Sequence, residues 1–122
     1  VYAFEDAEAL FDFKPAGGGG SADTGEVVAA VTSSGSPHSV TETKTISRPT
    51  VSAAAFFQLP AAGSATAYAN YVVKDGKGIA GSGHPITVTA AAGTIDGAAS
   101  NSISSDYGAK VYVSDGTNWN VI

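Results

Sequence analysis

Hydrophobic and polar positions alternate in short runs from residue 26 onward, and clusters of Gly, Pro, Ser and Asp separate these runs. Runs rich in β-branched and aromatic residues are typical of β-strands joined by turns. No stretch in this part of the chain keeps a helical period for three turns. The pattern predicts an all-β domain over residues 26–122, with strands in the segments VVAAV, SVTETKTISR, AAAFFQL, NYVVKD, PITVTA, SNSIS, AKVYVS and WNVI.

The segment SVTETKTISR, residues 39–48, is the most polar of these predicted strands. Alternation places Thr41, Thr43 and Thr45 on one face of the strand. The other face carries Val40, Glu42, Lys44 and Ile46. This composition predicts a strand at a sheet edge or facing solvent.

Three Asp-Gly pairs predict tight hairpin turns, because both residue types tolerate positive φ. They are Asp75-Gly76, Asp96-Gly97 and Asp115-Gly116. The last pair joins AKVYVS to TNWNVI, so the sequence is expected to end on a strand that is tied into a sheet. The apolar positions expected to fill the core are Phe57, Leu59, Val72, Ile86, Val88, Ile95, Val111, Trp119 and Ile122.

Residues 1–15, VYAFEDAEALFDFKP, form an acidic and aromatic segment that differs from the rest of the chain. Its apolar spacing is compatible with a short amphipathic helix, and an extended arm fits almost as well. Residues 16–25, AGGGGSADTG, have the composition of a flexible linker. The large apolar side chains of the arm need a covering surface, on their own domain or on a partner, and the candidate partner-binding residues are Tyr2, Phe4, Leu10, Phe11 and Phe13.

The net charge of -5 is concentrated in the segment 1–26, which holds six carboxylates and one lysine. The remainder is neutral, with five carboxylates balanced by five Lys and Arg residues. No cluster of basic residues suits a phosphate backbone, so we expect no nucleic-acid partner. No apolar run is long enough to cross a membrane. Charged residues make up only 14% of the chain, which predicts that partner subunits cover part of its surface.

Residues 76–81 satisfy the spacing G-x-G-x-x-G of a dinucleotide-binding loop. That chemistry needs a helix starting at the loop, whereas a further strand pattern follows here, so a glycine-rich hairpin loop is the better interpretation. His38 and His84 both adjoin proline and lack the spacing of a metal site. We therefore expect no cofactor and no metal.

No nucleophile motif is present, and the dispersed aspartates are more typical of turn caps than of a carboxylate pair. The sequence accordingly favours a non-enzymatic protein. Five aromatic residues could form a platform for sugar rings, although packing in a core or an interface is the preferred interpretation. They are Tyr68, Tyr71, Tyr107, Tyr112 and Trp119.

Three blocks occur in order along the second half of the chain: FFQLPAAG (residues 56–63), YVVKDGKGIAGSGHPITVTAAAGTIDGAAS (71–100) and SDGTNWNVI (114–122). Together they resemble a module of bacteriophage virion proteins, found in tail fibres, tailspikes, neck appendages and head-decoration proteins. The resemblance implies an antiparallel, jelly-roll-like β-sandwich that works as a homotrimer and has no catalytic activity. Residues 1–25 lie outside it.

The sequence shows neither heptads nor the rung repeats of a β-helical shaft. It therefore predicts a capsid decoration or cement protein on the virion exterior, with the arm contacting the major capsid protein or another virion protein. Two alternatives remain. One is a receptor-binding module that contacts host surface glycan, and the other is an enzyme domain that hydrolyses surface polysaccharide.

Overall fold

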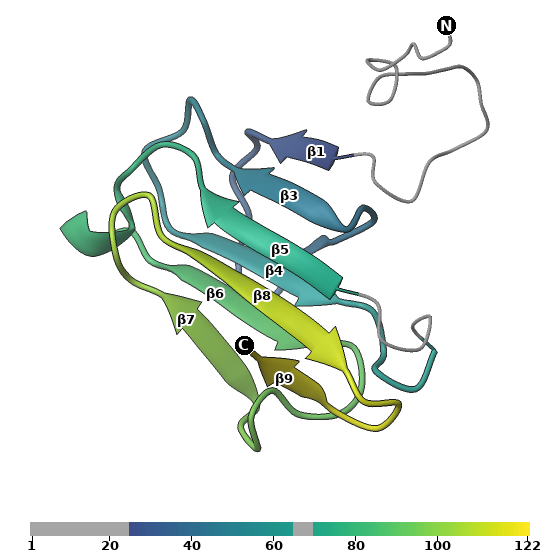
Figure 1. Cartoon of the computed structure of the whole chain (residues 1–122). Coiled ribbons are helices and arrows are strands. Elements are labelled where there is room, and N and C mark those ends of the chain that lie inside the picture. The colour runs from purple at the N-terminus through teal and green to yellow at the C-terminus, as the bar shows by residue number, and fades with distance from the viewer. Residues whose placement is uncertain (1–24, 65–69) are drawn as a thin grey trace, which may run out of the picture.

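The computed structural model describes residues 25–64 and 70–122 (Figure 1). These residues are nearly all β, and the single short helical turn described is η2, Ala80–Ser82. The strands are β1 Gly25–Val28, β2 His38–Ser39, β3 Lys44–Ser47, β4 Ala55–Leu59, β5 Asn70–Asp75, β6 Ile86–Ala90, β7 Ser100–Ile103, β8 Ala109–Ser114 and β9 Trp119–Val121. Gly25 belongs to β1, so the strand-forming part begins one residue before the predicted boundary. The predicted arm and the rest of the linker lie outside the described residues.

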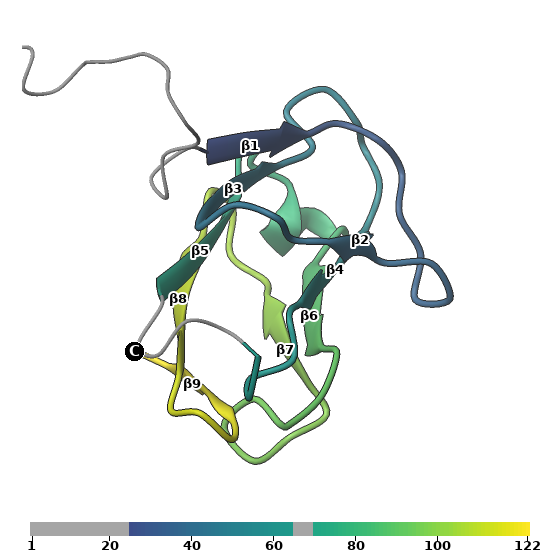
Figure 2. The same cartoon turned by 90° about the vertical axis from the view of Figure 1, so that its right-hand side faces the viewer.

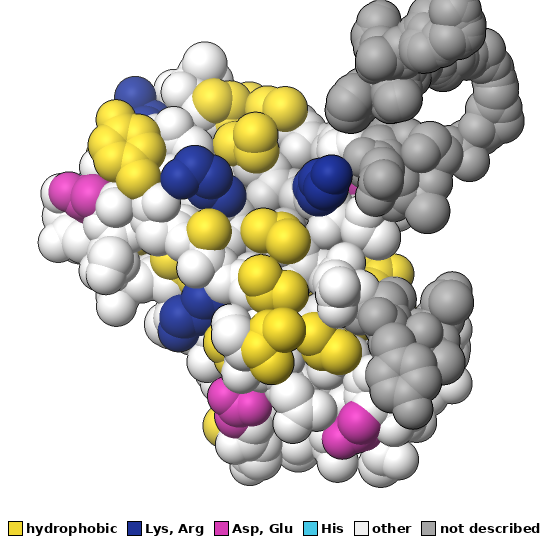
Figure 3. Space-filling view, viewed as in Figure 1, with side chains coloured by type: hydrophobic (Ala, Val, Ile, Leu, Met, Phe, Trp, Pro, Cys, Tyr) yellow, Lys and Arg dark blue, Asp and Glu magenta, His cyan; other side chains and the backbone are white. Residues whose placement is uncertain are grey.

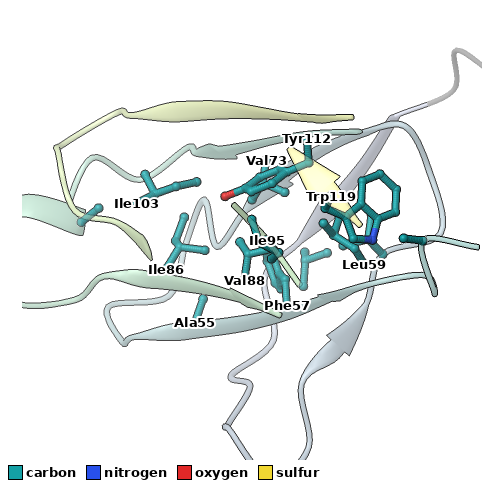
Figure 4. Packing of buried hydrophobic residues seen from close by; sticks show 14 residues of the cluster. Ala55, Phe57, Leu59, Val73, Ile86, Val88, Ile95, Ile103, Tyr112 and Trp119 are labelled. Carbon is teal, nitrogen blue, oxygen red and sulfur yellow. The ribbon is translucent and has the colours of Figure 1, made fainter. Parts of the chain in front are cut away.

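The strands form two sheets, ordered β1-β3-β5-β8-β9 and β2-β4-β6-β7. Figure 2 shows the two sheets facing each other. Side chains from both sheets point into the space between them, where Phe57 and Val88 lie opposite Tyr112 and Val73 (Figure 4). This layered arrangement buries most inward side chains of the longer strands and leaves the outward side chains of each sheet on the surface.

Strand direction differs from the prediction of an antiparallel, jelly-roll-like sandwich. Strands β1, β3 and β5 are parallel in one sheet, and β2, β4 and β6 are parallel in the other. Only the pairs β5-β8, β6-β7 and β8-β9 are antiparallel. From β1 to β6 the chain alternates between the sheets, so it winds as a flattened coil before the last three strands close it.

The turns of this coil have unequal lengths, which explains why no repeat is visible in the sequence. Glu26 pairs with Thr45 and His38 pairs with Phe57, so the first turn has the same length in both sheets. The next turn is longer, because Thr45 pairs with Val73 and Phe57 pairs with Val88. The pairing of backbone strands thus defines the coil, and the sequence does not repeat from one turn of the coil to the next.

Six of the nine residues expected in the core are buried there: Phe57, Leu59, Ile86, Val88, Ile95 and Trp119. The expectation is wrong for Val72, Val111 and Ile122. In β5 the inward positions are Val73 and Asp75, so alternation turns Val72 outward. In β8 the inward residues Tyr112 and Ser114 turn Val111 outward in the same way, and Ile122 is 79% exposed.

The polar strand β3 lies inside its sheet, between β1 and β5, so the predicted edge position is wrong, whereas the predicted alternative of a solvent-facing strand holds for its outer face. Its inward side chains, Thr45 and Ser47, are buried, while Ile46 faces outward and is 41% exposed. Thr45 is accommodated because its hydroxyl donates a hydrogen bond of 3.2 Å to Glu26 of the neighbouring strand β1. The sequence predicts the two faces of this strand, but the buried face is the one that carries the polar residues Thr45 and Ser47.

The Asp-Gly pairs have different roles. Asp115-Gly116 joins the antiparallel strands β8 and β9, as predicted, and Asp96-Gly97 makes a tight turn with φ of 50° and 79°. Asp75-Gly76 is not a hairpin, because β5 and β6 lie in different sheets. Gly76 begins a crossover that carries η2, and Asp75 is completely buried.

Candidate functional site

A buried ion pair lies where several connecting segments meet. Arg48 follows β3 and Asp75 ends β5, and an Arg48 Nη2 to Asp75 Oδ1 distance of 3.5 Å joins them. The two residues are only 1% and 0% exposed. Arg48 has a φ of 42°, in the left-handed region, so the chain bends directly after β3. We call this pair the Arg48/Asp75 centre.

Both members of the Arg48/Asp75 centre hold neighbouring backbone groups. The Arg48 guanidinium donates to the carbonyl oxygens of Ala53, at 2.7 Å, and His84. Those carbonyls precede β4 and β6. The Asp75 carboxylate accepts backbone amide hydrogens at 2.8 to 3.3 Å, from Gly78, Ile79, Ala80 and Tyr107. One ion pair therefore holds together the segments that follow β3 and β5 and those that precede β4, β6 and β8.

The chemistry of the centre is structural. Burial by itself raises the pKa of Asp75, but amide hydrogen bonds from Ala80, Gly78 and Tyr107 and the charge of Arg48 outweigh burial and lower that pKa below its ordinary value. The carboxylate stays ionised, its oxygens are occupied by amides, and neither residue is accessible to a substrate. The centre positions loops and is not placed to react.

The G-x-G-x-x-G segment contributes to this centre. Its amides at Gly78, Ile79 and Ala80 converge on a carboxylate of the same chain, in the manner in which backbone amides surround a bound anion. Apart from the short turn η2 no helix follows the loop, as expected, but the expected hairpin loop is wrong, because β5 and β6 lie in different sheets. The internal anion was not predicted. The signal was Asp75 itself, placed directly before the glycines.

A second polar cluster ties β1, β2 and β3 together through Glu26. Its carboxylate lies 2.9 Å from His38 Nε2 and accepts the Thr41 amide at 2.9 Å and the Thr45 hydroxyl at 3.2 Å. Burial acts to raise the pKa of Glu26, and hydrogen bonds from Thr41, His38 and Glu42 together lower it. His38 thus has one carboxylate neighbour, and the described residues contain no group of three or more His, Cys, Asp or Glu side chains that could hold a metal ion.

The remaining aspartates also support turns. Asp96 accepts the Val121 amide at 3.1 Å, and Asp106 accepts the Gly81 amide at 2.8 Å. Asp115 accepts two amides of its own turn, from Thr117 and Asn118. The interpretation as a turn cap is confirmed for Asp115, whereas Asp96 and Asp106 bind amides of segments that are distant in the sequence.

The four candidate aromatic residues that the structure describes do not form a platform. Tyr112 and Trp119 are completely buried, and Trp119 packs edge to face on Tyr71 with ring centroids 5.3 Å apart. Tyr107 is 61% exposed, and Tyr68 lies outside the described residues. Beside Tyr107, a shallow pocket of about 190 Å³ is lined by residues 102–105 and 108–110.

The outer face of the five-stranded sheet exposes several apolar side chains. We call it the apolar–lysine face and define it by Val27, Lys44, Ile46, Val72, Lys74, Val111, Val113 and Ile122. Val27 is 64% exposed, and Ile46 and Ile122 are 41% and 79% exposed. Figure 3 shows apolar side chains running across this face with basic side chains beside them and acidic side chains toward its margins.

Strand register arranges this face in rows. Gly25, Lys44, Val72 and Val111 pair in succession across β1, β3, β5 and β8, and the Ile122 amide donates to the Val111 carbonyl at 3.1 Å. The neighbouring row holds Val27, Ile46, Lys74 and Ala109. Sequence reasoning missed this surface because it placed Val72, Val111 and Ile122 inside. The five candidate arm residues, Tyr2, Phe4, Leu10, Phe11 and Phe13, lie outside the described residues.

The chain matches no protein-family model and no curated protein. No helix in residues 25–64 and 70–122 is long and apolar enough to cross a membrane. The geometry above is therefore the basis for assigning a function.

Proposed function

We propose that this chain is a non-enzymatic structural protein of a bacteriophage virion, and specifically a capsid decoration or cement protein on the virion exterior. Its two facing sheets act as a β-sandwich that assembles as a homotrimer. Residues 1–15 anchor it to the major capsid protein or another virion protein. The protein requires no cofactor for this role.

The observation that carries the proposal is the apolar–lysine face. Exposed apolar side chains gathered on one side of a sheet mark a surface for protein contact. Such a surface suits a component of an assembly. The acidic centres of the domain, in contrast, are engaged with its own backbone amides, as described for Asp75 and Glu26.

The sequence blocks that resemble phage virion modules give further support, because they coincide with the parts that build this fold. FFQLPAAG covers most of β4 and its exit, and the second block contains most of β5, the crossover that follows Asp75, and β6. SDGTNWNVI forms the β8-β9 turn and brings Trp119 into the core. These blocks specify architecture, which agrees with a structural role.

The test combines light scattering with co-sedimentation on empty capsids of the virus that carries the gene. We expect a trimer that pellets with capsids, and loss of pelleting in the variant Phe11→Ser/Phe13→Ser. The matched control is Phe56→Ser, a half-buried phenylalanine of β4, outside the anchoring segment. A monomer, or full capsid occupancy by the double variant, would contradict the proposal.

One observation favours the alternative of a receptor-binding module for host glycan. Tyr107 is an exposed aromatic residue and precedes Gly108, which lines the shallow pocket, and Lys74 Nζ lies 5.8 Å from the centre of the Tyr107 ring. In that case the variant Tyr107→Ala would weaken saturable binding to host cells. Absence of binding to any host surface would remove this alternative.

A further inference from the structure

We infer that the apolar–lysine face is the docking site for residues 1–15 of the same chain in the free protein. This goes beyond the proposed function, in which that segment contacts the shell, because it names what covers the face before attachment. The occupant is a peptide segment that is both acidic and aromatic.

Chemical complementarity is the first argument. The face offers aliphatic side chains together with the ammonium groups of Lys44 and Lys74, of which Lys74 Nζ also donates to the Tyr107 carbonyl at 2.8 Å. No carboxylate is an outward-facing residue of the described strands β1, β3, β5, β8 and β9, since Glu26 and Asp75 both turn inward. Residues 1–15 carry four carboxylates against one lysine, with large apolar residues between them. The charges of the two partners are therefore opposite, and both carry apolar side chains that can pack against each other.

The position of the linker is the second argument. Gly25 begins β1 at the edge of this sheet, in the same row as Lys44, Val72 and Val111. Residues 16–24 span at most about 30 Å when extended. The row from β1 to β8 crosses three strand spacings, or about 14 Å. A segment preceding this linker can reach the whole face of its own copy.

The tether also reduces the affinity that docking requires. A short flexible linker gives an effective concentration in the millimolar range, so a weak contact suffices to fill the face. A second copy placed symmetrically on the same face would instead bring Lys44 and Lys74 near their own counterparts, which is unfavourable. Charge therefore favours the acidic segment over a symmetric contact between two faces.

Paramagnetic NMR on the full chain tests this inference. The chain has no cysteine, so a nitroxide attached to the variant Ala9→Cys is unique. We expect the methyl signals of Ile46, Val72 and Val111 to be much weaker in the paramagnetic sample than in the same sample after the nitroxide has been reduced. The methyl signal of Thr87, an outward residue of β6 in the other sheet, should keep its intensity.

Two charge reversals provide a matched pair. Lys44→Glu, on the face, should restore the lost intensity, whereas Lys77→Glu, in the β5-β6 crossover, makes the same change in net charge and should leave the loss intact. Trp119 fluorescence verifies that each variant remains folded. High salt, with a Debye length of about 3 Å at 1 M, should weaken the effect without abolishing it, because the apolar contacts persist.

Mixing experiments decide whether the contact is within one chain. A spin-labelled chain is mixed with an isotope-labelled chain that carries no spin label. Intensity loss that occurs only when the spin label and the isotope label are on the same chain supports docking within the chain. Loss in the mixed sample would assign the face to a neighbouring copy, and no loss in any sample would leave the face without this occupant; either result overturns the inference. Neither result depends on capsids, so it is separable from failure of the proposed function.

Discussion

At the scale of single residues, Asp75 shows how a buried charge organises a fold without taking part in chemistry. Its carboxylate is surrounded by four backbone amides and one guanidinium, all from its own chain. Burying a carboxylate is costly unless charge and hydrogen bonds compensate, and here both do. The same spacing of glycines that brings amides to a phosphate in other proteins brings them to Asp75.

Two glycines make it possible to measure the stability cost of a left-handed backbone separately from the cost of a steric clash. Gly83 and Gly93 have nearly equal φ, 92° and 91°, but a Cβ on Gly83 would meet nothing, whereas one on Gly93 would lie 2.6 Å from the Thr117 carbonyl oxygen. Gly83→Ala should cost about 1–2 kcal/mol, the usual penalty for a left-handed residue. Gly93→Ala should cost about 1–3 kcal/mol more, because a backbone atom must move.

Denaturant unfolding of both glycine variants measures this difference directly. Equal midpoints for Gly83→Ala and Gly93→Ala would show that the Thr117 segment moves away at no cost. The comparison needs no assumption about the strain itself, since φ is nearly the same at both positions.

At the scale of elements, the β8-β9 hairpin closes the core through one residue. Trp119 is completely buried, its indole N–H donates to the Pro60 carbonyl at 3.0 Å, and its ring packs on Tyr71. The hairpin thereby connects the five-stranded sheet to the end of β4 in the other sheet. Ile122, three positions later, contributes a backbone hydrogen bond and an exposed side chain.

The two apolar residues of this hairpin should respond differently to truncation. Trp119→Ala should destabilise the fold by about 3–5 kcal/mol, as expected for a large buried aromatic residue. Ile122→Ala should change stability by less than about 0.5 kcal/mol, because its side chain is on the surface. Thermal and denaturant unfolding measure both, and a large loss for Ile122→Ala would place that side chain in an interface.

At the scale of the whole molecule, parallel pairing between distant segments dominates the first six strands. Paired residues such as Phe57 and Val88 are far apart in the sequence, and β5 pairs with β8 across a still longer connection. Polar contacts of Glu26 and of the Arg48/Asp75 centre hold successive turns together. Because these contacts depend on ionised carboxylates, the stability of the whole domain depends on pH.

Acid should destabilise the domain through these two carboxylates. The pKa of Asp75 and that of Glu26 are lowered by folding from ordinary values of 3.8 and 4.5, so both groups stabilise the folded state above those values. That contribution is lost as the pH falls from about 4.5 through the lower pKa values of the folded state. Unfolding free energy measured from pH 7 to pH 2 should therefore decrease with falling pH.

The variant Asp75→Asn identifies the main source of the acid effect. It should be less stable than the original chain at pH 7 and show a weaker dependence on pH. Asp106→Asn is a control, because Asp106 is an exposed carboxylate that is not part of the Arg48/Asp75 centre. An unchanged pH profile in Asp75→Asn would show that other groups control acid unfolding.

The sequence by itself determined the secondary structure class and part of the core. Strand composition and turn residues are local properties, so the all-β class, the Asp115-Gly116 hairpin and the burial of Phe57, Ile86 and Trp119 could be predicted. Local pattern also predicts that the acidic segment at residues 1–15 is distinct from the domain.

Only the tertiary structure decided which strands are neighbours and which face of each strand is buried. Alternation defines two faces but does not say which one meets the other sheet, so Thr45 and Ser47 are inside while Val72 and Val111 are outside. The partners that permit this choice, such as Arg48 for Asp75, are distant in sequence and become adjacent only through parallel pairing of β3 and β5. The apolar–lysine face follows from the same choice, since each inward polar residue turns its apolar neighbour toward the surface.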